Sequence, residues 1–91
     1  MPPAAKSKPR HAPVRELLAL NLIRLRGARD WSQEDLALEC GLHRTFVAHV
    51  ERQARNISLD NLDKLAKAFG LQAYELLMPG SQEVQAKNVS Q

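Results

Sequence analysis

Residues 33–52 read QEDLALECGLHRTFVAHVER, and this stretch has the spacing of two short helices joined by a tight turn. Such a pair needs a small residue where the helices cross, a glycine at the turn and apolar residues at fixed offsets. Ala37 fills the first role. Gly41 fills the second, because it can take the left-handed conformation that ends a helix without steric cost. The apolar offsets are occupied by Leu36, Cys40, Leu42, Val47 and Val50. Any helical hairpin with a glycine turn could share this pattern.

The hydroxyl residues around this hairpin mark where helices begin. Ser32 is predicted to accept from free backbone N–H groups at the start of the helix that runs to Cys40. Asp35 stands where a capping box has the longer Glu, so we expect that box to be imperfect. The next helix is predicted from His43 to about Arg52, with His43 in the capping position.

Two further helices are predicted downstream of the hairpin. Ser58 is expected to cap the first of them, and Gly70 to end it. Its predicted apolar stripe consists of Leu59, Leu62, Leu65, Ala66 and Phe69. A short fifth helix is predicted over Ala73 to Met78, closed by Pro79 and Gly80.

Upstream of the hairpin, leucines spaced three and four apart predict a first helix from Val14 to about Arg26, stopped or frayed by Gly27. The core-facing set is predicted to be Leu18, Leu22 and Leu25. This leaves Leu17, Leu20 and Ile23 as apolar residues beyond what one buried stripe needs. Such an excess indicates either an interface or a surface covered by the fifth helix or the tail.

The length and composition place these helices in one small domain. The chain has 91 residues, 44% of them hydrophobic and 25% charged, which is ordinary for a globular protein. No strand pattern is visible, so the predicted fold is all-α with five short helices over residues 14–79. A flexible basic arm is predicted over residues 1–13 and a flexible tail over residues 80–91. The chain lacks an apolar run of about 20 residues and a signal-peptide pattern, so a cytoplasmic protein is predicted.

The charges are segregated along the chain. The formal net charge is +3, but Lys6, Lys8 and Arg10 supply it, and the remainder carries equal numbers of bases and acids. Acidic residues crowd positions 34–39, whereas Arg44, Arg52 and Arg55 follow with one acid among them. This distribution predicts one basic surface on a neutral body.

The string WSQEDLALECGLHRTFVAHVERQARNISLDNLDKLAKAFGLQAYELL, together with LIRLR at residues 22–26, resembles the Cro/repressor-type (XRE-type) helix-turn-helix family. The family pattern runs S-Q-x-x-L-A, G-[LV]-S, a recognition helix, E-R-G, and a helix ending in L-G. The resemblance covers Leu22 to Leu77. It implies a lambda-repressor-like DNA-binding domain of five helices, whose third helix enters the major groove of double-stranded DNA.

Residue roles follow from the resemblance where this chain matches the family. The base-reading positions are Arg44, Thr45, Phe46 and His49. Arg44 is the principal candidate, because an arginine can donate two hydrogen bonds to guanine O6 and N7. Phe46 either contacts a thymine methyl or packs inward at the helix start. His49 is either a base contact or a solvated surface residue.

Further positions match family residues that contact the DNA backbone or stabilise the fold. The phosphate-binding candidates are Gln33, Arg55, Asn56 and Ser58, and for Gln33 a solvated side chain is the alternative. Arg26 and Glu51 match a pair that bridges the first and third helices. One departure from the family is Gln53 in place of glycine, where a left-handed backbone would carry a steric cost of roughly 1–2 kcal/mol.

The resemblance also implies a homodimer, since paired recognition helices must reach half-sites about 34 Å apart. The interface candidates are Leu17, Leu20, Ile23, Tyr74, Leu77 and Met78. A controller of a restriction-modification system, an antitoxin that covers a protein partner, and a purely structural bundle are the alternatives. The basic arm either follows DNA or only aids solubility.

Catalysis, a metal site and a cofactor are not expected. Cys40 falls on a core offset and suits an apolar filler better than a nucleophile. His11, His43 and His49 are split between the arm and the recognition helix, which is poor spacing for metal ligands. The sequence therefore predicts a binding protein without enzyme activity.

Overall fold

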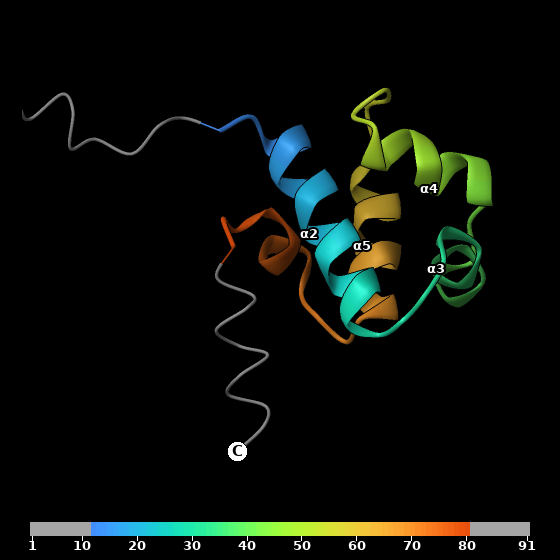
Figure 1. Ribbon diagram of the computed structural model, residues 1–91. Coiled ribbons are helices and arrows are strands. Elements are labelled where there is room, and N and C mark those ends of the chain that lie inside the picture. The colour runs from blue at the N-terminus through green and yellow to red at the C-terminus, as the bar shows by residue number, and fades with distance from the viewer. Residues whose placement is uncertain (1–11, 81–91) are drawn as a thin grey trace, which may run out of the picture.

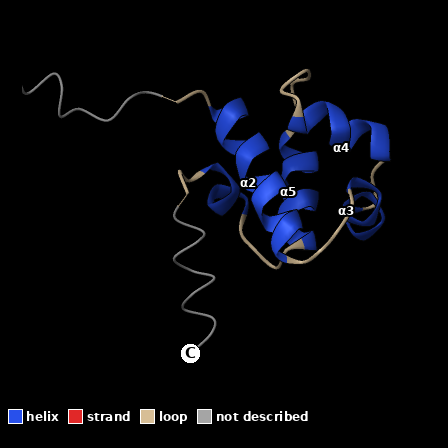
Figure 2. Ribbon diagram, in the orientation of Figure 1, coloured by secondary structure: helices blue, strands red, loops and turns tan. Residues whose placement is uncertain are grey.

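The computed structural model describes residues 12–80, which form four α-helices and one 3-10 helix, without a strand in this range (Figures 1 and 2). The elements are α2 (Val14–Ala28), α3 (Gln33–Cys40), α4 (Arg44–Glu51), α5 (Leu59–Ala68) and η1 (Ala73–Leu77). The all-α prediction is thus confirmed for these residues, whereas the count of five α-helices is not. Most of the predicted arm and tail, with Lys6, Lys8, Arg10 and His11, lies outside the described residues.

The segment that was predicted as a fifth helix forms the short 3-10 helix η1. Gln72 caps it and donates its backbone N–H to the Glu75 carboxylate at 2.8 Å. The chain leaves the helical conformation at Met78, whose ψ is 143°. Pro79 explains this, because a residue before proline is pushed out of the helical region. Too few residues remain between Gln72 and Pro79 for a stable α-helix, and short segments of this kind commonly adopt the tighter 3-10 form.

A single apolar core joins all five elements. α4 packs against α2 and α3, α3 packs against α5, and η1 packs against α2 and α5. The side chains at its centre are almost inaccessible to solvent: Leu18, Leu22, Leu36, Val47, Val50, Leu65 and Leu76. All five offsets predicted for the hairpin are buried or packed against this core. Leu25 is partly buried at its edge.

Leu59 does not belong to the buried stripe of α5, although the spacing predicted it. Its side chain is 80% exposed, while Leu62, Leu65, Ala66 and Phe69 are buried as expected. Leu59 is the first residue of the helix, directly after the Ser58 cap. Its side chain lies outside the packed region, which begins at Leu62 one turn later.

Three helices end in the same hydrogen-bonded motif, with a residue of positive φ just after the cap. These residues are Asp30 after α2 (φ 57°), Gln53 after α4 (φ 61°) and Gly70 after α5 (φ 73°). In each case the next N–H donates to the carbonyl five residues back, as in a Schellman motif. The prediction that Gly27 ends the first helix is wrong, because α2 continues through Gly27 to Ala28 and turns at Asp30.

The start of α3 is capped more completely than predicted. The Ser32 hydroxyl accepts from the Asp35 N–H at 2.9 Å, and the Asp35 carboxylate accepts from the Ser32 N–H at 2.8 Å. The predicted imperfect box is therefore a full capping box, in which the shorter Asp reaches the backbone N–H. At the other end Gly41 is left-handed with φ 74°, as expected.

Asn21 is a polar residue inside the packed face of α2. It is 1% exposed, and its Nδ2 donates to the carbonyls of Leu76 at 2.7 Å and Met78 at 2.8 Å. Since an unpaired buried amide is costly, these two bonds fix η1 onto α2. No local pattern predicts this role, because the two acceptors lie 55 and 57 residues away in the chain.

A stack of side chains joins three helix ends. The rings of Trp31 and Phe69 lie 5.4 Å apart with planes inclined by 29°, and the Arg29 guanidinium lies 5.1 Å from each ring centroid. Arg29 also donates to the carbonyls of Ala68 and Phe69 at 3.2 and 3.1 Å. The end of α2, the approach to α3 and the end of α5 are thereby held together.

Candidate nucleic-acid interface

α4 lies at an edge of the molecule and turns one face outward (Figure 1). Val47 and Val50 are buried on its inner face, while Arg44 and Thr45 in its first turn are exposed. No residue among those described pairs with the Arg44 guanidinium. His43 is the N-cap residue of α4, but its side chain makes no capping hydrogen bond. The first turn of α4 therefore leaves the side chains of Arg44 and Thr45 accessible to solvent.

Four of the predicted contact residues surround one hollow on this surface. Thr45, Phe46, His49 and Arg55, with His43, line a cavity of about 300 Å³. Phe46 is half-buried and packs against the core. Part of its ring therefore faces inward, as one of the two alternatives for this residue expects. His49 is likewise half-buried. The loop after α4 thus brings Arg55 next to the outer face of the helix.

Glu51 anchors the back of α4 in a network of three side chains. Its carboxylate accepts from Arg26 Nε at 2.7 Å and Arg26 Nη2 at 2.9 Å, and from Gln33 Nε2 at 2.9 Å. The Glu51 side chain is 5% exposed and that of Arg26 is 18% exposed. The hydrogen bond to Glu51 raises the pKa of the Arg26 guanidinium, against the opposing effect of burial.

Arg26 and Gln33 extend this network to the start of α3. Arg26 Nη1 donates to the Trp31 carbonyl at 2.8 Å, just before the Ser32 cap. Gln33, which we predicted as a phosphate ligand, is neither freely solvated nor exposed, because Glu51 holds its amide. One N–H of that amide points away from the Glu51 bond, and Gln33 Oε1 is also unengaged among the described residues. The network fixes the orientation of Gln33 relative to α4.

The loop between α4 and α5 holds the remaining phosphate candidates. Gln53 takes the left-handed conformation that the family gives to glycine, with φ 61°. Arg55 and Asn56 follow it and are exposed. Ser58 caps α5 by accepting from the Asn61 N–H at 3.0 Å, so its hydroxyl oxygen is partly committed to the fold.

The predicted interface residues fall on α2, η1 and the segment that follows η1. Leu20 is 46% exposed, Ile23 43% and Tyr74 65%, whereas Leu17, Leu77 and Met78 are half-buried. Leu77 packs against the core. Of the apolar excess on α2, Leu20 and Ile23 thus remain exposed within residues 12–80.

Cys40 and the described histidines, His43 and His49, belong to no metal-binding group within residues 12–80. Cys40 is buried, and burial raises the pKa of its thiol, which disfavours the nucleophilic thiolate. The described side chains contain no group of three or more His, Cys, Asp or Glu placed to hold a metal ion. None of the helices over this range has the length and apolar character needed to cross a membrane.

Comparison with known proteins agrees with this geometry. The helix-turn-helix family HTH_3 matches residues 22–76, which is more than half of the chain. The protein therefore belongs to the helix-turn-helix family of DNA-binding transcriptional regulators.

The chain is also similar to individual proteins. A hypothetical transcription factor from Neisseria meningitidis is 50% identical over 66 residues, which cover 72% of this chain and 62% of that protein. Control protein C.BamHI from Bacillus amyloliquefaciens is 56% identical over 46 residues, covering 50% of this chain and 57% of that protein. The chain thus spans less than two thirds of the length of these two relatives.

Solved structures share the arrangement of helices. The crystal structure of a hypothetical transcription factor from Neisseria superposes with a TM-score of 0.72 at 42% identity, over 88% of this chain and 97% of that one. The restriction-modification controller protein C.AhdI from Aeromonas hydrophila gives a TM-score of 0.65 at 44% identity, over 68% of this chain and 94% of that one.

Proposed function

We propose that the protein is a homodimeric transcriptional regulator that binds a roughly two-fold symmetric operator, with α4 of each subunit in the major groove. The observation that carries the proposal is the orientation of α4. Its inner face is locked by Val47, Val50 and Glu51, while Arg44 and Thr45 face solvent without an internal partner. A rigid helix with free donors in its first turn suits the reading of base edges.

Contacts to the DNA backbone would position this helix. Gln33 is held by Glu51, and Arg55 lies beside the hollow on α4, so the two flank the helix from α3 and from the loop. Asn56 and the Ser58 hydroxyl are further candidates. Such contacts fix the orientation of the protein on the duplex and carry no sequence information. Base reading falls to Arg44, Thr45, His49 and the exposed edge of Phe46.

The dimer would form through the exposed apolar residues of α2 and η1. Leu20, Ile23 and Tyr74 are the most exposed of the six candidates. A two-fold contact on this surface would leave both copies of α4 free for half-sites about 34 Å apart.

The experiment is selection of binding sites from a random DNA pool by the purified protein, followed by the same selection with Arg44→Ala. We expect an enriched symmetric site with the wild type. With the variant, preference at one base pair of each half-site should relax by about 1–3 kcal/mol, the value of one bidentate arginine contact. Lys67→Ala, at the far end of α5, is the control. Absence of any enriched symmetric site with the wild type would falsify the proposal.

A narrower version is favoured by the relatives. C.BamHI is a control protein and C.AhdI is a restriction-modification controller protein, and both exceed 40% identity to this chain over the matched residues. We infer that the operator lies upstream of a restriction-modification gene set that includes the gene of this protein. Mapping the selected site onto the source genome tests this version. A site beside unrelated genes would leave a general regulator, and a co-purifying toxin would favour the antitoxin alternative.

A further inference from the structure

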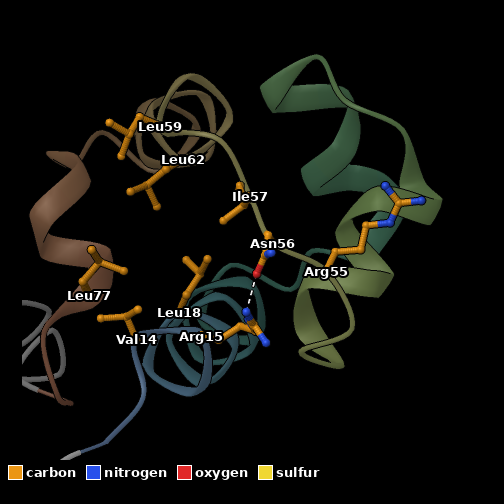
Figure 3. Close-up of a pocket in the computed structure, with 9 residues that line it drawn as sticks. All are labelled: Val14, Arg15, Leu18, Arg55, Asn56, Ile57, Leu59, Leu62 and Leu77. Carbon is orange, nitrogen blue, oxygen red and sulfur yellow. Dashed lines mark hydrogen bonds between the residues drawn. The ribbon is translucent and has the colours of Figure 1, made fainter.

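Arg15 lies 41 residues from Asn56 in the chain, yet its guanidinium Nη2 donates a hydrogen bond to Asn56 Oδ1. Figure 3 shows the contact at the rim of a hollow lined by apolar side chains of α2, α5 and η1. Both residues are exposed. The contact joins the first turn of α2 to the loop that carries Arg55, whose side chain extends away from it (Figure 3).

The charge of Arg15 is not neutralised by a neighbour within the part of the chain that the structure describes. The ion pairs found there join Arg26 to Glu51 and Lys67 to Asp63. Glu16, the next residue along α2, is not paired with Arg15 in this set. Asn56 is uncharged, so the hydrogen bond leaves a full positive charge at the surface.

The position of Arg15 is unfavourable for the helix that carries it. Arg15 is the second residue of α2, close to the positive end of the helix dipole. Acidic residues are stabilising there and basic residues are not. A cation at this position therefore interacts unfavourably with the α2 dipole.

The chemistry of the pair points to an anion. A guanidinium has five N–H donors and no acceptor, and one donor is used on Asn56. Because the Asn56 oxygen is engaged, its Nδ2 donors stay available, and no described residue accepts from them. Arg15 and Asn56 together thus present only donors, as a phosphate oxygen requires.

We propose that Arg15 is an additional DNA-backbone residue, which binds a phosphate beside the one held by Asn56 and extends the phosphate clamp from the α4–α5 loop onto α2. The inference rests on the proposed DNA-binding function. It adds a residue that lies outside the matched segment 22–76. Since the contact is to the backbone, it strengthens binding to every sequence alike.

The test measures the salt dependence of binding to a labelled duplex of mixed sequence, 24 base pairs long, for wild type, Arg15→Gln, Arg15→Lys and Lys67→Gln. Arg15→Gln should reduce the slope of log K against log salt by about 0.9, the value for one phosphate. Arg15→Lys should keep the slope, since it keeps the charge. Lys67→Gln makes the same change in net charge in the last turn of α5, at the end of this helix away from the Asn56 loop. It should leave the slope unchanged.

Thermal unfolding supplies the second readout. Arg15→Gln should unfold at the same temperature as the wild type or higher, because it removes a cation from the positive end of α2. A residue that only ties α2 to the loop would give the opposite pattern, a lower melting temperature with the wild-type slope.

The outcomes separate this inference from the proposed function. An unchanged slope for Arg15→Gln overturns the inference, as does an equal loss for Lys67→Gln, while a specific operator would still support the regulator. If the wild-type protein binds neither the mixed duplex nor any selected site, the proposed function fails and the inference fails with it.

Discussion

Glu51 accepts hydrogen bonds from Arg26 and Gln33, and its side chain is only 5% exposed. A buried ion pair contributes little net free energy to folding, because both charges lose their hydration. Removal of one partner is destabilising, because the other charge is left buried without a partner. The network therefore acts chiefly to fix geometry. It holds α4, the end of α2 and the start of α3 in one arrangement.

Glu51→Gln should destabilise the fold by about 3 kcal/mol, the lower end of the range for breaking a buried pair, because Arg26 keeps some contact with water. Urea unfolding followed by circular dichroism measures the change. The double variant Arg26→Met with Glu51→Met is the matched comparison, since it removes both charges. It should be more stable than Glu51→Gln, and a double variant that is the less stable of the two would show that the charges are themselves stabilising.

Single residues also show where sequence reasoning reaches its limit. The roles of Gly41, Ser32 and Ser58 follow from local backbone chemistry, and the structure confirms them. Asn21 and Arg15 depend on contacts with residues 55, 57 and 41 positions away, which no local pattern encodes. The base-reading and phosphate roles remain predictions, because they concern atoms of a partner rather than atoms of this chain.

At the level of the helices, the three Schellman endings place different residues in the conformation of positive φ. Gly70 fits this conformation freely, Asp tolerates it, and a glutamine is strained by roughly 1–2 kcal/mol. The N–H of Gln53 donates to the carbonyl three residues back and the next N–H to the carbonyl five residues back, as they do at Gly70. The residue of positive φ after α4 is thus a glutamine, whereas the equivalent residue after α5 is a glycine.

Gln53→Gly should stabilise the protein by about 0.5–1 kcal/mol, because relief of the strain exceeds the added entropy of the unfolded chain. Asp30→Gly, at the equivalent position of α2, should gain less. Melting temperatures of the two variants measure the difference. A lower melting temperature for Gln53→Gly would mean that the glutamine side chain makes a stabilising contact that outweighs its backbone strain.

Element boundaries were predictable where a capping residue stands beside the helix and unpredictable where the signal is ambiguous. Gly27 suggested a helix end, yet a glycine in the last turn is tolerated, and the turn falls at Asp30 instead. The spacing of apolar residues marks α5 correctly but cannot show that Leu59 precedes the packed region. The 3-10 form of η1 depends on Pro79 and on the docking by Asn21, which are effects of context.

At the scale of the whole molecule, the exposed apolar residues of α2 and η1 bear on assembly. Ile23→Asp should convert the proposed homodimer into a monomer, because a charge buried at a two-fold contact meets its own copy. Sedimentation equilibrium over a range of concentrations measures this. Leu38→Asp changes an exposed leucine of α3, away from this surface, and is the control.

The same variant separates assembly from DNA contact. Ile23→Asp should bind a single half-site as a monomer and lose the preference for symmetric operators. If the wild type is itself monomeric at all concentrations, or if Leu38→Asp dissociates it equally, the assignment of the interface to α2 and η1 is wrong.

The stack of Arg29, Trp31 and Phe69 has a practical consequence for all these measurements. Trp31 is the sole tryptophan of the chain, and its indole lies where three helix ends meet. Its ultraviolet emission therefore reports on one defined junction, without an attached dye. A shift of this emission to longer wavelength during denaturation would show when the junction separates. Comparison with the loss of helical circular dichroism would show whether it separates before the helices unfold.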